Sequence, residues 1–150
     1  MIEVRKVKFV EILDAANSVA LLEEYAAECS VPEIGPIAPQ RDIYAMLERH
    51  DAMQCFGAFD GYNLVGFANV IPDIIPHYGK KVAKIESLFV PSDRRKYGGA
   101  GTKLKAAVKA YARETGCVGV FYTARIGSTL ESILDMTTTR THAVFYEAFL

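Results

Sequence analysis

The sequence has few residues that would support a metal centre or a disulfide framework. Its three cysteines, Cys29, Cys55 and Cys117, are odd in number, widely spaced and not arranged as CxxC, so neither a disulfide framework nor a zinc site is indicated. The three histidines are isolated and lack ligand spacing, and we therefore predict no bound metal. This use of cysteine is typical of a protein of the reducing cytoplasm.

Long apolar runs and a one-sided charge balance are also missing. No apolar stretch approaches twenty residues, and residues 1–9 lack the apolar core of a signal peptide, which argues against secretion and membrane spanning. The formal net charge is −1, so no global basic field favours nucleic acid. The 150 residues, 51% of them hydrophobic, predict one folded domain spanning residues 1–150.

Hydrophobic periodicity predicts a mixed α/β fold. Apolar residues at helical spacing and alternating or β-rich runs follow one another along the chain, with no repeat or low-complexity segment. The predicted strands are 2–10, 54–59, 64–71, 81–90, 118–123 and 141–150, and the predicted helices are 12–29, 40–49, 101–115 and 128–135, the last capped by Ser128. Strand 118–123 follows a β-α-β crossover and is therefore predicted to lie parallel to strand 81–90.

Residues 85–116 combine a strand, a basic glycine-rich turn and an amphipathic helix. The turn holds three basic residues and three glycines, namely Arg94, Arg95, Lys96, Gly98, Gly99 and Gly101. Glycine lets the backbone turn tightly and approach a ligand closely. The free N–H groups and the dipole of the helix start attract an anion. We therefore predict a phosphate or pyrophosphate site here.

Two common phosphate-binding motifs do not fit this turn. A Walker loop requires a glycine five residues before Gly101, and none is present. A dinucleotide fingerprint requires a glycine where Leu104 stands and an acidic residue about twenty positions later, a region that holds Phe-Tyr-Thr at 121–123.

The segment instead resembles the acyl-CoA loop of the GNAT N-acetyltransferase superfamily, [RQ]-x-x-G-x-[GA] between a strand and a helix. Residues 95–100 (Arg-Lys-Tyr-Gly-Gly-Ala) match this pattern. A second register uses residues 96–101 and places Leu104 and Val108 where the family has its first buried helix residues. Both registers stay open.

The resemblance extends to nearly the whole chain, because the predicted order β-α-α-β-β-β-α-β-α-β is that of the GNAT acyl-CoA N-acyltransferase fold. It implies that strands 81–90 and 118–123 splay apart to admit the pantetheine arm of acetyl-CoA. The implied cofactor-binding residues are Leu88, Phe89, Val90, Arg95, Lys96, Tyr97, Gly98, Gly99, Ala100, Gly101 and Thr102.

Acetyl transfer to an amine also needs a base, because a primary amine of pKa about 10.4 is only about 0.1% neutral near pH 7.4. Glu86 is the candidate: the resemblance places it on the catalytic strand, and strict alternation puts it on one face with Leu88 and Val90. The competing interpretation is a solvent-facing carboxylate paired with Lys84.

The general acid has no clear candidate, because residues 127–138 lack the tyrosine that many relatives carry in this helix. Ser128 or Ser132 is the alternative for contacting the cofactor, and Tyr122, Tyr146 or water for protonating the thiolate. The loop 30–39, with three prolines and the single charge of Glu33, is predicted to border the acceptor site as a lid.

Two functions follow from the sequence. The first is an acetyl-CoA-dependent N-acetyltransferase acting on a primary amine of a small molecule or peptide. The alternative is a catalytically weak or inactive acyl-CoA-binding module with a sensing or partner-binding role. In both cases we expect acetyl-CoA as the bound co-substrate and neither nucleic acid nor membrane as a partner, while a homodimer stays open.

Overall fold

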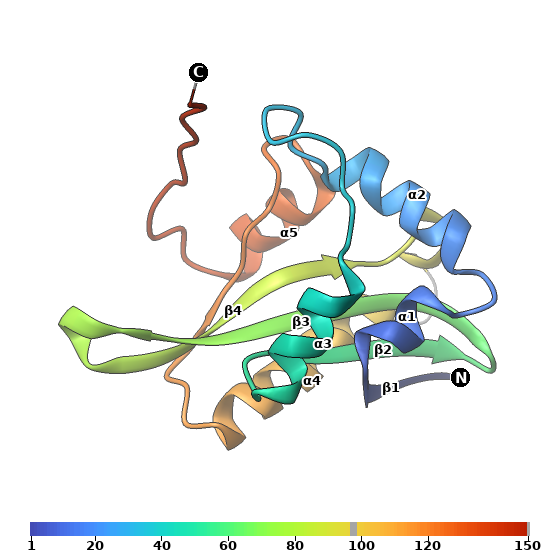
Figure 1. Cartoon of the computed structure of the whole chain (residues 1–150), viewed down its shortest axis with the longest axis horizontal. Coiled ribbons are helices and arrows are strands. Elements are labelled where there is room, and N and C mark those ends of the chain that lie inside the picture. The colour runs from blue at the N-terminus through green and yellow to red at the C-terminus, as the bar shows by residue number, and fades with distance from the viewer. Residues whose placement is uncertain (97–98, 150) are drawn as a thin grey trace.

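Alternating and helical apolar patterns fold into a central sheet with helices on both faces (Figure 1). The computed structural model describes residues 1–96 and 99–149. Its strands are β1 (Ile2–Val7), β2 (Gln54–Asp60), β3 (Asn63–Ile75), β4 (Lys80–Phe89) and β5 (Val120–Phe121). Its α-helices are α1 (Phe9–Leu13), α2 (Ser18–Cys29), α3 (Arg41–Arg49), α4 (Ala100–Glu114) and α5 (Thr129–Thr137), and short 3₁₀ turns lie at Pro76–Tyr78 and Ser92–Arg94.

The five strands lie in the order β1-β2-β3-β4-β5. Strands β1 to β4 pair antiparallel, whereas β5 runs parallel to β4, as the crossover through α4 predicts. The β4–β5 pairing is limited to Ala83 with Val120 and Lys84 with Phe121. The two strands therefore splay apart beyond Lys84, which confirms the predicted opening between them.

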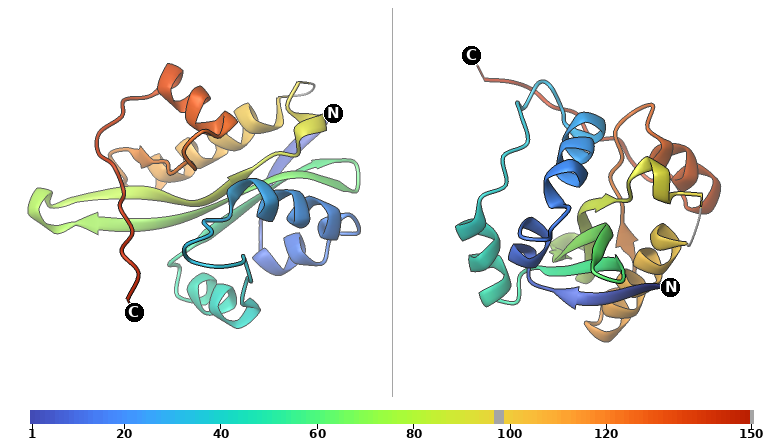
Figure 2. Two further views of the ribbon diagram at one scale, coloured as in Figure 1. Left: turned by 90° about the horizontal axis from the view of Figure 1, so that it is seen from above. Right: turned by 90° about the vertical axis from the view of Figure 1, so that its right-hand side faces the viewer.

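Each face of the sheet buries its own core. On one face α4 buries every fourth residue, Ala100, Leu104, Val108 and Ala112, against apolar residues of β1 to β4. On the other face, α1, α2 and α3 cover a second cluster that contains Phe67 and Phe89. Figure 2 shows the sheet between these two helical layers.

The predicted helix 12–29 is divided into α1 and α2, and a contact that is remote in sequence explains the break. The Asn17 side chain donates to Leu64 O at 2.8 Å and accepts from Leu64 N at 3.1 Å. Ser18 Oγ donates to Leu13 O across the break at 2.8 Å. The amide of Asn17 thus ties the turn to β3 in place of a helical hydrogen bond.

The strand predicted for 141–150 is wrong for residues 141–149, and Leu150 lies outside the described residues. The side chains of Val144, Phe145 and Phe149 are 80%, 91% and 97% exposed, respectively. The alternating pattern favours a strand, but a strand also needs a neighbouring edge, and none pairs with this segment among residues 1–96 and 99–149.

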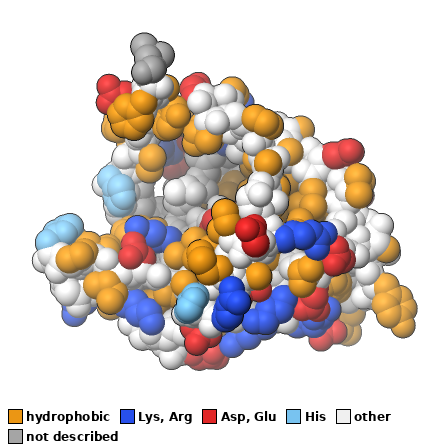
Figure 3. Space-filling model, viewed as in Figure 1, with side chains coloured by type: hydrophobic (Ala, Val, Ile, Leu, Met, Phe, Trp, Pro, Cys, Tyr) orange, Lys and Arg blue, Asp and Glu red, His pale blue; other side chains and the backbone are white. Residues whose placement is uncertain are grey.

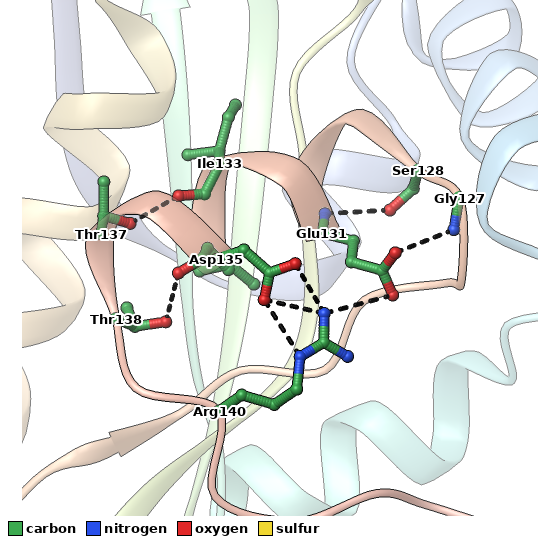
Figure 4. Close-up of polar contacts among 9 residues, drawn as sticks. Gly127, Ser128, Glu131, Ile133, Asp135, Thr137, Thr138 and Arg140 are labelled. Carbon is green, nitrogen blue, oxygen red and sulfur yellow. Dashed lines mark hydrogen bonds and ion pairs between the residues drawn. The ribbon is translucent and has the colours of Figure 1, made fainter.

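Side-chain contacts of helix α5 fix the start and the end of this helix, just before segment 141–149 (Figure 4). Ser128 Oγ accepts from Glu131 N at 3.1 Å, which confirms the predicted cap. At the other end, the Arg140 guanidinium donates to both carboxylate oxygens of Asp135, at 2.7 and 2.6 Å from Nη2, and lies 3.9 Å from Glu131. These pairs hold residue 140 against α5 as the chain leaves the helix.

Candidate active site

Glu86 lies at a bulge in β4. Asn69 of β3 pairs with Ser87 and Val70 pairs with Ile85, so Glu86 has no partner in the β3–β4 register. The extra residue breaks the alternation of side chains. Ile85 and Leu88 therefore both pack in the α4-side core. The sequence prediction that Glu86 shares a face with Leu88 and Val90 is wrong for this reason.

The Glu86 carboxylate faces the α1–α3 side and accepts three hydrogen bonds. Tyr44 OH donates to Oε1 at 2.8 Å, and Ser87 Oγ donates to Oε2 at 2.8 Å. Asn69 Nδ2 donates to the same Oε2 at 3.2 Å. These three donors fix the orientation of both carboxylate oxygens. Lys84 pairs with Asp73 instead, and the alternative pairing of Glu86 with Lys84 is not found.

Asn69 supports this carboxylate from a fully buried position. Its Nδ2 also donates to Ser87 Oγ at 2.9 Å, whereas its Oδ1 is buried without a hydrogen-bond partner among the described residues. Two acceptors on one side fix the orientation of the amide. Sequence analysis did not assign Asn69 to the site. Its signal is a single amide inside the apolar run 64–71.

Two tyrosines border the carboxylate, and both stay protonated. Burial and the nearby charge of Glu86 raise the pKa of Tyr44 and of Tyr25 well above the usual range. Tyr44 also stacks on Phe9, with ring centroids 3.7 Å apart. Because its phenol stays neutral at physiological pH, Tyr44 donates to Glu86 there.

A pocket of about 330 Å³ opens beside Glu86. Its lining comes from α2, α3, the sheet and the loop that follows α2, including Ile37, Ala38 and Pro39. The C-terminal half of the proline-rich loop thus borders the pocket, whereas Glu33 is exposed and is not part of the lining. Figure 3 shows the face above the sheet hollowed between this loop and the segment 139–149.

The predicted anion site lies at the start of α4. Gly99 is the N-cap residue with φ of +67°, in the left-handed region that favours glycine, and Ala100 begins the helix. The N–H groups of the first turn, from Ala100 to Thr102, have no acceptor within the helix. The side chains of Lys96 and Thr102 are exposed, and Gly101 is half-buried. Tyr97 and Gly98 lie outside the described residues.

Arg95 has a different position from the other loop residues. Its guanidinium forms an ion pair with Glu28 of α2, and its Nε donates to Val90 O at 2.9 Å. It therefore ties the end of β4 to α2. On β4 itself, Leu88 and Phe89 pair with Ala68 and Phe67 of β3, while their other edge has no strand partner among the described residues.

The candidates for the general acid lie elsewhere. Tyr122 has a buried hydroxyl without a hydrogen-bond partner among the described residues, and Tyr146 is 55% exposed in segment 139–149. Ser128 caps α5, and Ser132 is exposed on the same helix. None of these four side chains lines the pocket beside Glu86 within the described part of the chain.

No metal or membrane feature accompanies this site. Within residues 1–96 and 99–149, no three His, Cys, Asp or Glu side chains are grouped so that they would hold a metal ion. No helix in the same residues has the length and apolar character needed to cross a membrane.

Comparison with known proteins identifies the family. The Acetyltransferase (GNAT) family model matches residues 19–129, so the chain belongs to the GNAT acetyltransferases. Its mixed five-stranded sheet agrees with that fold, although the strand predicted to close the order is not formed in residues 141–149. The comparison with curated proteins returned no match.

Solved structures of similar fold include enzymes that acetylate different acceptors. The ribosomal-protein-alanine N-acetyltransferase of Brucella melitensis biovar Abortus 2308 superposes with a TM-score of 0.73 at 18% identity, covering 100% of this chain and 99% of that one. The aminoglycoside acetyltransferase meta-AAC0020 from an uncultured soil metagenomic sample, solved with sisomicin, gives 0.72 at 19% identity, covering 99% and 96%. At these identities the likeness concerns the fold.

Proposed function

We propose that the protein is an acetyl-CoA-dependent N-acetyltransferase that acetylates a primary amine of a small molecule or peptide by direct attack on the thioester. The observation that carries the proposal is the position of Glu86, whose carboxylate lines a pocket at the bulge of β4 and is oriented there by hydrogen bonds from Tyr44, Ser87 and Asn69. A carboxylate that lines a pocket next to the splayed strands of a GNAT fold is suited to deprotonating an amine.

The described residues fit acetyl-CoA at the start of α4. A side chain added at Gly99 would meet no atom of the described residues within 4 Å, so these residues leave space beside the free N–H groups of the first turn. The buried positions of Leu104 and Val108 favour the register in which residues 96–101 form the loop. In this proposal Lys96, Gly99, Ala100, Gly101 and Thr102 hold the pyrophosphate, with Tyr97 and Gly98 between them.

The remaining contacts come from β4. Beyond Lys84, the edge of β4 that faces away from β3 has no strand partner among the described residues. In this proposal the backbone groups of Leu88, Phe89 and Val90 that point to that edge, apart from Val90 O, bind the amides of the pantetheine arm and the thioester oxygen. Arg95 supports this edge through Val90 O and Glu28 and is assigned a positioning role. When bound, acetyl-CoA supplies the electrophilic acyl carbon and a thiolate leaving group.

Glu86 removes a proton from the acceptor nitrogen as the new N–C bond forms. Near pH 7.4, deprotonating a primary amine costs about 4 kcal/mol, and a base can offset up to this amount of the activation free energy. Tyr44 stays neutral and donates to Oε1, which orients the carboxylate. A thiol of pKa near 8.5 is already a tolerable leaving group, so water suffices to protonate the thiolate.

Two measurements test the proposal together. The first follows the melting temperature with CoA, because ligand at 100 times its Kd stabilises the native state by about 2.7 kcal/mol. The second follows thiol release and N-acetylated product with acetyl-CoA and pooled primary amines. Binding with product supports the enzyme. Binding without product from any amine supports the alternative, an acyl-CoA-binding module, which the missing tyrosine in residues 127–138 favours.

A further inference from the structure

The pocket beside Glu86 is lined mainly by apolar side chains. Its walls are aliphatic and aromatic side chains, among them Leu22 of α2, Ile43 and Leu47 of α3, and Met53. Among the described residues that line it, Glu86 is the only charged one. The pocket therefore offers one charged group for an amine nitrogen, the polar side chains of Gln40 and Ser87, and otherwise mostly apolar surface.

Aromatic rings make the inner wall rigid. The Tyr25 ring meets the Phe67 ring edge to face with centroids 5.3 Å apart, and Phe9 stacks on Tyr44. All four rings line the pocket. Packed aromatic rings provide a largely apolar surface for the substituent of a ligand.

The volume of the pocket and the charge of its lining restrict the class of acceptor further. About 330 Å³ is at the small end of ligand pockets, which commonly span about 300 to 1,000 Å³. A polyamine or aminoglycoside would bring additional ammonium groups against walls that hold no second carboxylate in the described residues, so these groups would form no ion pair there.

We infer that the acceptor is a primary monoamine with a compact apolar substituent, aromatic or branched aliphatic, which fills the pocket while its nitrogen lies at Glu86. This inference rests on the proposed acetyl transfer and adds the class of acceptor. Burying a side chain of this size favours binding by about 10- to 100-fold over a small hydroxylated amine.

Two residues of α3 provide a matched pair of variants. Ile43 and Met46 are 49% and 45% exposed, so a charge at either leaves the core intact. Ile43 lines the pocket and Met46 does not. Ile43→Asp therefore places a charge in the apolar wall, whereas Met46→Asp makes the same change on the same helix outside it.

The test compares kcat/KM with acetyl-CoA for 2-phenylethylamine, 3-methylbutylamine, ethanolamine and spermidine. We expect the two apolar amines to exceed ethanolamine and spermidine by about tenfold or more. Ile43→Asp should remove most of this preference, and Met46→Asp should retain it. A wild-type preference for spermidine, or equal values for apolar and hydroxylated amines, would overturn the inference and leave the acetyl transfer standing.

A binding measurement separates the two proposals. Saturation-transfer NMR with the protein alone should show 2-phenylethylamine, but not ethanolamine, in contact with the protein, and Ile43→Asp should weaken the signal. Absence of that signal contradicts the assigned acceptor class. Absence of acetylation of all four amines, with 2-phenylethylamine and CoA both bound, contradicts the proposed reaction and leaves an apolar amine site.

Discussion

Replacing Glu86 by glutamine removes the proposed base while keeping its shape. The side chain is exposed toward the pocket and accepts from Tyr44 at Oε1 and from Ser87 and Asn69 at Oε2. A glutamine carbonyl at the Oε2 position accepts the same two hydrogen bonds, and its NH₂ group at the Oε1 position donates to the Tyr44 oxygen. The variant should therefore fold with the same bulge and bind CoA as the parent does.

The expected kinetic loss follows from the protonation of the acceptor. An amine of pKa about 10.4 is about three pH units from half-neutral at pH 7.4, a deficit of about 4 kcal/mol. Without the carboxylate, turnover then depends on the small neutral fraction in solution. We expect kcat to fall by about 10²- to 10⁴-fold at that pH, with little change in the affinity for acetyl-CoA.

The assay is the pH–rate profile of both proteins with two acceptors. Activity of Glu86→Gln should rise about tenfold per pH unit between pH 7 and 9, because the neutral amine increases by that factor. An acceptor amine of pKa near 7 should reduce the difference between parent and variant. If the two proteins show the same profile, or the same loss with both acceptors, Glu86 is not the base.

Three further predictions concern binding and stability. Thr102→Glu adds a carboxylate to the exposed first turn of α4, which should stabilise the unliganded helix slightly. The same charge should weaken CoA binding about tenfold in a calorimetric titration. Ala106→Glu, farther along the same helix, should leave CoA binding unchanged. Burial raises the pKa of the Cys29 thiol from 9.0 to about 11. The folded state therefore favours the protonated thiol, and the stability that this preference contributes is present below pH 9 and lost as the pH rises toward 11. Urea denaturation at pH 8 to 11 should show a shallower decline for Cys29→Ser; an unchanged slope refutes this assignment. Ser128→Ala removes the cap of α5 and should lower the free energy of unfolding by about 1 kcal/mol, an effect that Ser128→Asp should largely restore.

The fold was predictable where local pattern decides the structure. Helix α4 follows from apolar residues at every fourth position, the β2–β3 hairpin from its turn residues, and the start of α5 from Ser128. These signals lie within a few residues of the feature they specify. These signals led to the GNAT fold, and the family model over residues 19–129 confirms the family, although the strand predicted to close the order is not formed in residues 141–149.

Other features depend on contacts that a local pattern does not contain. The bulge at Glu86 arises from how β4 pairs with β3, and strict alternation therefore placed that side chain on the wrong face. Arg95 matched the loop motif, but its partner Glu28 lies on a different helix. Segment 141–149 has the alternation of a strand but pairs with no strand edge in the part of the chain that the structure describes.

Asn69 and Tyr44 of the site also depend on contacts between elements that are distant in the sequence. Asn69 was the most accessible signal, because a buried amide in an apolar strand requires polar partners. Its partners, Glu86 and Ser87, are adjacent only through the antiparallel register. Tyr44 comes from α3, and its contact with Glu86 depends on how that helix packs on the sheet.

The proposed reaction is acetylation of an amine with Glu86 as the base. Its most direct test is mass spectrometry of the products formed from acetyl-CoA, labelled with ¹³C in the acetyl group, and 2-phenylethylamine near pH 7.4. We expect the labelled amide to accumulate in step with free CoA thiol, and Glu86→Gln to lose both in the same proportion. Thiol release without labelled amide, or undiminished amide from Glu86→Gln, would contradict it.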